Sequence, residues 1–147
     1  MSKVAAALVS IVCSSLVAFV IHKPVADLLP QWIGEHMAGI EIKRPPYGLE
    51  VVIPAALSSV EVGAGLFFAY FVIRKALPNR STLVRALCLF LLCLALGGHL
   101  IRFPLMQLVV GNPLGVTLVQ HAGIWLPLLA ASLTLAFTYE WLSKRVA

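Results

Sequence analysis

Residues 51–73, VVIPAALSSVEVGAGLFFAYFVI, form an apolar stretch that carries one charge, Glu61, near its middle. A helix of this length and composition can cross the hydrocarbon core of a bilayer. A carboxylate deep in a membrane is costly, and such a group usually marks a functional site and has a partner. The stretch therefore predicts a membrane-spanning helix in which Glu61 is a candidate ligand- or proton-binding residue.

The composition of the whole chain agrees with a membrane protein. Of its 147 residues, 61% are hydrophobic and 12% are charged, whereas a soluble domain has about 25% charged residues. The length predicts a single domain over residues 1–147. No run of Lys and Arg with interleaved aromatic residues occurs, so nucleic-acid binding is not expected. Cys13, Cys88 and Cys93 lie inside apolar runs without a CxxC motif, and we expect neither a disulfide framework nor a metal site.

Three further apolar runs, at residues 4–21, 83–103 and 114–139, predict three more spanning helices. The expected fold is thus an all-α bundle of four transmembrane helices. Between the first two helices, apolar residues recur at helical spacing over residues 27–39. This pattern predicts a short amphipathic helix that lies on the membrane surface or folds over the bundle as a lid. Residues 104–113 have the composition of a turn.

The basic residues predict the orientation in the membrane. An even number of crossings places both termini on one side, and cytoplasmic segments carry an excess of Lys and Arg. The side with the termini has seven basic residues: Lys3, Arg74, Lys75, Arg80, Arg85, Lys144 and Arg145. The opposite side has three, Lys23, Lys43 and Arg44, and Arg102 lies at its boundary. We therefore expect both termini in the cytoplasm, most simply at a bacterial inner (plasma) membrane.

The remaining polar residues of the spans are expected to gather in one outward-facing cleft. At about 1.5 Å of rise per residue, Glu61 lies near the midplane, His99 and His121 lie above it, and Arg102 lies at the outer mouth. His121 matches Glu61 best in depth, and a Glu–His pair tolerates burial better than a lone carboxylate. Helical spacing also places His99 and Arg102 on one face. Three supporting residues share the inward stripes, namely Ser58, Thr117 and Trp125.

Three hypotheses of function follow from this cleft. In the first, the protein binds or helps to move a small solute or a proton, with Glu61 as the titrating group. In the second, it is a non-catalytic accessory or assembly subunit that self-associates or joins a larger membrane complex. In the third, His99 and His121 are the axial ligands of a haem; no other cofactor is expected. Neither a nucleotide-binding motif nor a GxSxG or HExxH element is present, so the sequence indicates no enzyme.

Overall fold

The computed structural model describes residues 2–36, 48–109 and 112–145, and for some residues inside α1 and α2, Glu61 among them, it describes the backbone alone. These ranges contain helices and no strand, which confirms the all-α class. The helices are α1 (Lys3–His36), α2 (Leu49–Ala76), α3 (Thr82–Leu96), α4 (Arg102–Val109) and α5 (Leu114–Lys144).

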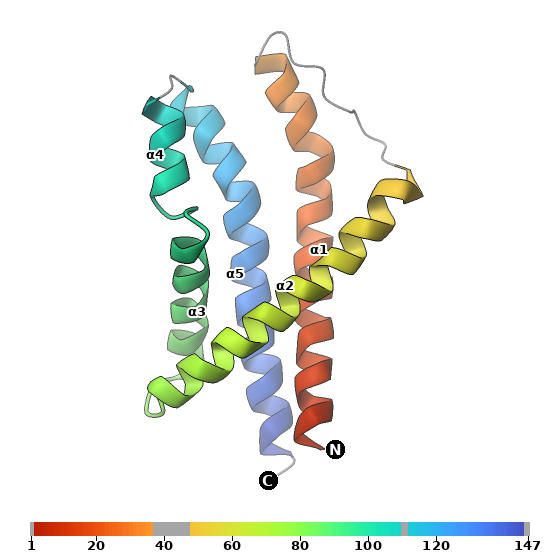
Figure 1. Cartoon of the computed structure of the whole chain (residues 1–147), viewed down its shortest axis with the longest axis vertical. Helices are drawn as coiled ribbons and strands as arrows, with labels where there is room; N and C mark the ends of the chain where they lie inside the picture. Colours follow the sequence, from red (N-terminus) through yellow and green to blue (C-terminus); the bar gives the residue numbers. More distant parts are fainter. Residues whose placement is uncertain (1, 37–47, 110–111, 146–147) are drawn as a thin grey trace.

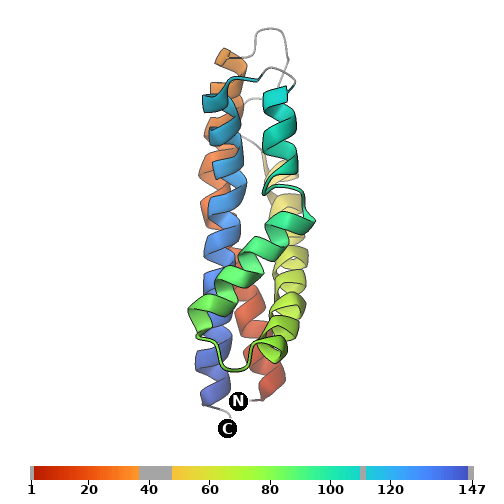
Figure 2. The ribbon, with the colours of Figure 1, turned by 90° about the vertical axis from the view of Figure 1, so that its left-hand side faces the viewer.

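The helices form an elongated arrangement in which α1 and α5 run side by side along the long axis (Figure 1). α2 crosses them obliquely, and α3 and α4 follow one another along the other side of α5. Both termini lie at one end, which also holds the connection between α2 and α3 (Figures 1 and 2). α4 and the start of α5 lie at the opposite end, so the two ends of the molecule are built from different parts of the chain.

Two helices are long and apolar enough to cross a membrane by length and composition, α1 over Lys3–Ile33 and α5 over Leu114–Lys144. α3 is a shorter apolar helix. Large apolar side chains are exposed on the outside of the molecule, for example Val20, Phe68 and Leu96. Contact of apolar side chains with lipid has no cost in free energy, whereas their contact with water is unfavourable.

α1 and α5, which lie against each other, both bury small side chains. Ala6, Ser10 and Ser14 of α1 and Ala131 and Ser132 of α5 are fully buried. The Ser10 hydroxyl donates to the Ala6 carbonyl oxygen at 2.8 Å within its own helix, so it needs no partner across the junction. Small residues let two helix backbones approach closely, which is how helices associate in a membrane.

The junction of α1 and α2 depends on Gly63. A Cβ at this position would overlap the Ser15 hydroxyl and lie 2.9 Å from the Ile11 carbonyl oxygen. Gly63 therefore permits a close approach of α1 and α2 at this point.

The N-terminal region differs from the expectation of a spanning helix over 4–21 and a separate amphipathic helix over 27–39. α1 is continuous to His36 and contains Pro24 and Pro30; residues 37–39 lie outside the described part. The prediction of a separate surface helix was wrong as far as residue 36, because α1 continues without a break and Leu29 lies against Gly123 of α5. A Cβ on Gly123 of α5 would lie 2.6 Å from Val25 Cγ1.

The two prolines do not end α1, although each removes a backbone hydrogen bond. An ion pair between Lys23 Nζ and Asp27 Oδ2, 2.8 Å long, joins the turns on either side of Pro24. In membrane helices, neighbouring helices and local adjustments compensate for proline. The packing against α5 therefore outweighs the local preference for a break.

The third expected helix, over 83–103, is also divided differently. α3 ends at Leu96, and Gly98 has a φ of +72°. The Gly98 N–H donates to the Ala95 carbonyl oxygen at 3.1 Å and the His99 N–H to that of Leu94 at 2.9 Å. This pair of bonds is the Schellman motif, which favours glycine at the left-handed position.

After this turn the chain forms α4, where a turn over 104–113 was expected. That prediction was wrong for residues 104–109, which are helical. Pro104 does not prevent the helix, because it falls within the first turn of α4, where its missing N–H costs nothing. The other two helices agree with expectation: α2 covers 51–73, and α5 covers 114–139 and continues to Lys144.

Candidate functional site

A cavity of about 370 Å³ lies between α1, the α3–α4 turn, α4 and α5. We call it the polar cavity. The α3–α4 turn, α4 and the first half of α5 lie towards the end of the molecule that is remote from the termini (Figure 1). Most of its wall is apolar, and five polar side chains interrupt it: His22, His99, Gln107, Gln120 and His121. A largely apolar cavity with a few convergent polar groups is the usual form of a small-molecule site.

His121 of α5 is the most deeply buried of these polar residues, with 3% of its surface exposed. Its ring stacks on that of Trp125, one turn later, with centroids 5.7 Å apart and planes at 27°. Among the described residues neither ring nitrogen has a hydrogen-bond partner. A neutral imidazole has one donor and one acceptor, so His121 has two unmet hydrogen-bonding groups.

His99 lies next to His121, with ring centroids 6.1 Å apart. The Schellman turn that ends α3 fixes its backbone, and the indole Nε1 of Trp125 donates to its carbonyl oxygen at 3.0 Å. Gly97 leaves room for the ring, because a Cβ there would lie 3.0 Å from His99 Cδ2. The His99 Nδ1 atom is buried and has no partner in the described part of the chain. The structure therefore brings these two predicted site residues together in the wall of the polar cavity.

Gln107 of α4 and Gln120 of α5 complete the polar part of the wall. The side-chain oxygen of each is buried and accepts no hydrogen bond from the residues that the structure describes. Both lie in stretches that were interpreted as a turn and as a plain spanning helix, and neither was selected from the sequence. The sequence does indicate these two residues, since an amide side chain inside an apolar run is costly to bury and is therefore unusual there.

Other residues selected from the sequence lie elsewhere. Arg102 is exposed at the start of α4, with its guanidinium 5.9 Å from the Phe103 ring, and it does not line the polar cavity. Its predicted common face with His99 does not exist, because the helix is broken between them. Thr117 is buried, with a hydroxyl that lacks a partner among the described residues, but it is not part of the cavity wall.

Glu61 and Ser58 belong to α2, but their side chains lie outside the described residues. The pairing of Glu61 with His121 therefore stays a prediction. Within the described ranges, no group of three or more His, Cys, Asp or Glu residues could hold a metal ion.

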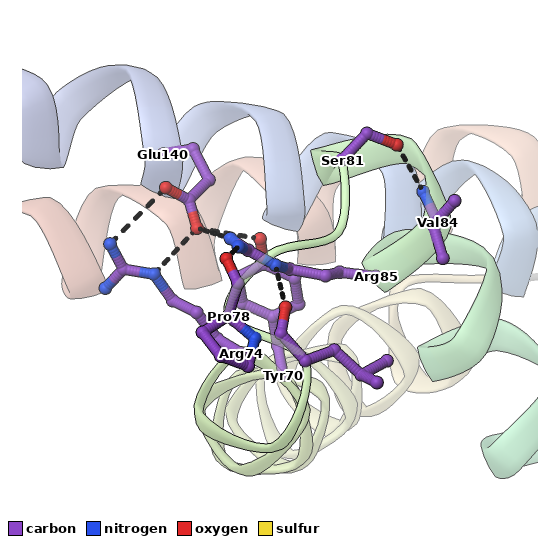
Figure 3. A network of polar contacts seen from close by, with 8 residues as sticks. Tyr70, Arg74, Pro78, Ser81, Val84, Arg85 and Glu140 are labelled. Carbon is purple, nitrogen blue, oxygen red and sulfur yellow. Dashed lines mark hydrogen bonds and ion pairs between the residues drawn. The ribbon is translucent and has the colours of Figure 1, made fainter.

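A second polar cluster surrounds Glu140, which lies near the C-terminal end of α5 (Figure 3). The buried Tyr70 hydroxyl donates to Glu140 Oε1 at 3.1 Å. Arg74 Nε lies 2.7 Å and Arg85 Nη1 lies 3.0 Å from the same oxygen. The carboxylate is 12% exposed and the Arg85 side chain 11%, so the pair that they form is well shielded from water.

Arg85 also closes the connection between α2 and α3. Its Nε donates to the Leu77 carbonyl oxygen at 3.0 Å and its Nη2 to that of Pro78 at 2.6 Å. The Glu140 cluster, which we define as Tyr70, Arg74, Arg85 and Glu140, thus ties α2, α3 and α5 together at the end that holds the termini. The sequence-based analysis missed it, although Glu140 is the one acidic residue that the predicted topology places among seven basic ones.

No protein-family model matches this sequence, and no curated protein or solved structure is significantly similar to it. Inference of function therefore depends on the polar cavity and on the Glu140 cluster.

Proposed function

We propose that the protein is a multi-pass membrane protein of a bacterial inner membrane, with four crossings formed by α1, α2, α3 with α4, and α5. The position of both termini at one end supports an even number of crossings. Basic side chains at that end lie over aromatic rings, as Lys75 does on Phe71 at 4.6 Å and Arg145 on Trp141 at 3.8 Å. Aromatic side chains are enriched at both membrane interfaces, and an excess of Lys and Arg is typical of the cytoplasmic side, so the basic residues at this end support cytoplasmic termini.

Its proposed function is to bind a small solute, or to help move a solute or proton, in the polar cavity on the side opposite the termini. The observation that carries this proposal is His121, which is buried with both ring nitrogens unpaired among the described residues. A buried polar group without a partner costs about 1–3 kcal/mol. Such a group in a folded protein calls for an explanation, and a bound molecule that supplies the missing hydrogen bonds is the explanation that we propose.

The contacts favour this function over a bis-histidine haem. A porphyrin between His99 and His121 needs an open slot around both rings. Trp125 instead stacks on the His121 ring and donates to the His99 carbonyl oxygen, so one side chain joins both segments beside the pair. Haem binding stays an alternative, and a Soret absorption band in the purified protein would establish it.

An accessory role is the second candidate, and α4 favours it. None of the residues of α4 is buried, and Leu105, Met106 and Val109 are each at least half exposed, at 53%, 50% and 69%. A helix of this kind offers a contact surface to another membrane protein or to a second copy of the chain.

Native mass spectrometry of the chain released from membranes distinguishes the two candidates. We expect a small adduct on the wild-type protein and on Thr117→Val, which removes an unpaired hydroxyl outside the cavity wall. His121→Phe keeps an aromatic ring against Trp125 but cannot form hydrogen bonds, and we expect it to lack the adduct. An adduct of equal occupancy on His121→Phe would refute the site. A stoichiometric protein partner in place of the adduct would establish the accessory role.

A further inference from the structure

The α3–α4 turn, residues 97–101, separates the two helices beside the polar cavity. In the proposed topology α3 and α4 together make one crossing, so this turn is irregular backbone inside the membrane. Such backbone is tolerated there only where it is buried in protein or lines a cavity. His99 belongs to the turn and lines the polar cavity. In secondary transporters, helices that are broken in this way form the substrate sites.

The turn and α4 are loosely packed. None of the residues from Ala95 to Val109 is buried, and Leu96 and Ile101 are 80% and 67% exposed. In the described parts of the chain, α4 packs on α5 and on no other helix. Segments with few buried contacts are those that open locally at a low cost in free energy.

A hydrogen bond from Trp125 of α5 fastens the turn to the rest of the molecule. The indole Nε1 donates to the His99 carbonyl oxygen at 3.0 Å. The same indole stacks on the ring of His121, which is almost fully buried. Trp125 therefore connects the loosely packed turn to a well-packed part of α5.

Gly97 and Gly98 make the turn suitable as a hinge. Gly98 has a φ of +72°, a conformation that glycine adopts without strain. A Cβ on Gly98 would lie 3.2 Å from the Phe103 ring, and a Cβ on Gly97 would lie 3.0 Å from His99 Cδ2. Phe103 and His99 both line the polar cavity. Rotation about the two glycines therefore moves two residues of the cavity wall.

We propose that the α3–α4 turn is the gate of the polar cavity, hinged at its two glycines and held closed by the hydrogen bond from Trp125 to His99. Opening of the gate moves part of the cavity wall away from His121 and gives a ligand access to it. Trp125 is a positioning residue in this role, because it acts through the two histidines. The inference rests on the proposed function and adds the route by which the ligand enters and leaves.

Thiol labelling of the full chain in lipid nanodiscs tests the gate, in a background without the native cysteines. Ala26→Cys places a reporter in the wall of the polar cavity, on α1. Ala122→Cys is the matched reporter, because Ala122 is also partly buried but lines a different cavity between α1 and α5. The measured quantity is the rate of reaction with N-ethylmaleimide.

Trp125→Phe keeps an aromatic ring against His121 and removes the N–H donor. We expect this change to raise the labelling rate of Ala26→Cys about two- to tenfold, which corresponds to the loss of a hydrogen bond between neutral groups. The labelling rate of Ala122→Cys should not change. Trp141→Phe is the matched control, because Trp141 is 54% exposed near the C-terminal end of α5, and it should change neither rate.

If Trp125→Phe does not fold, Gly98→Ala carries the same test, because alanine disfavours the left-handed conformation that closes the turn. It should also raise the labelling rate of Ala26→Cys. Gly115→Ala is its control, since a Cβ on Gly115 of α5 would meet no atom within 4 Å.

Two results would overturn the inference. An unchanged labelling rate of Ala26→Cys in Trp125→Phe would show that this hydrogen bond does not keep the cavity closed. An equal rise at Ala122→Cys would show a general loosening of α1 and α5. The proposed function fails separately, when the adduct in native mass spectrometry does not depend on His121.

Discussion

Replacing Glu140 with Gln is expected to destabilise the protein by about 2–3 kcal/mol. Removing one partner of a buried pair costs about 3–5 kcal/mol, and the loss is smaller here because the Gln side chain keeps an oxygen that accepts hydrogen bonds. The change removes the charge that faces Arg74 and Arg85 and keeps the size of the side chain. The Arg85 pair is the better shielded of the two, whereas the Arg74 side chain is 36% exposed. We therefore discount the Arg74 pair to the range of exposed salt bridges, about 0–1 kcal/mol.

The free energy of unfolding in mixed detergent micelles, measured by SDS titration and by thermal unfolding, tests this prediction. Asp27→Asn is the matched control, because Asp27 pairs with Lys23 on an exposed helix surface at a similar distance, 2.8 Å. It should cost about 0.3–0.5 kcal/mol, as exposed i,i+4 pairs do. A double-mutant cycle of Glu140→Gln with Arg85→Met should give a larger coupling energy than the cycle with Arg74→Met.

The reasoning is refuted if Glu140→Gln costs no more than Asp27→Asn. It is also refuted if the two cycles give equal coupling energies, because the cluster would then be a set of exposed pairs and would not hold α2, α3 and α5 together.

Three further predictions concern the turn, the cavity and the orientation. Gly98→Ala should cost about 1–2 kcal/mol in thermal unfolding, because Gly98 has a φ of +72°; a neutral effect would show that the Schellman turn does not form. Without ligand, His121→Phe and Thr117→Val should each raise the free energy of unfolding by about 1 kcal/mol, because each removes an unpaired buried polar group; destabilisation of both would mean that these groups are paired. In intact cells, a membrane-impermeant thiol reagent should label Asn112→Cys and not Ser2→Cys, in a background without the native cysteines; the reverse pattern would invert the topology.

Periodicity and length identified α2 and α5, because a long apolar run has few alternatives to a helix in a membrane. They failed where tertiary packing decides the outcome. Pro24 and Pro30 favour a break in α1, yet Val25 and Leu29 between them pack on α5 and the helix continues. The predicted helix over residues 83–103 includes the pair Gly97-Gly98, although Gly98 ends α3 by adopting a left-handed conformation.

For the candidate site, the sequence identified the residues that are unusual by type. His99 and His121 stand out as ionisable groups in apolar runs, and the structure brings them together. Gln107 became part of the wall only because α4 replaces the expected turn, which no local pattern indicated. Glu140 lies just past the predicted end of its span, so its partners Tyr70 and Arg85, about 70 and 55 positions away, could be found only from the fold.

The central claim is that a small molecule satisfies the buried histidine pair. A high-resolution density map of the wild-type chain in lipid nanodiscs tests it most directly. The account predicts density in the polar cavity within hydrogen-bonding distance of a His121 ring nitrogen, and no such density in His121→Phe. A map in which both His121 nitrogens bond to groups of the protein itself, with side chains filling the cavity, would contradict it.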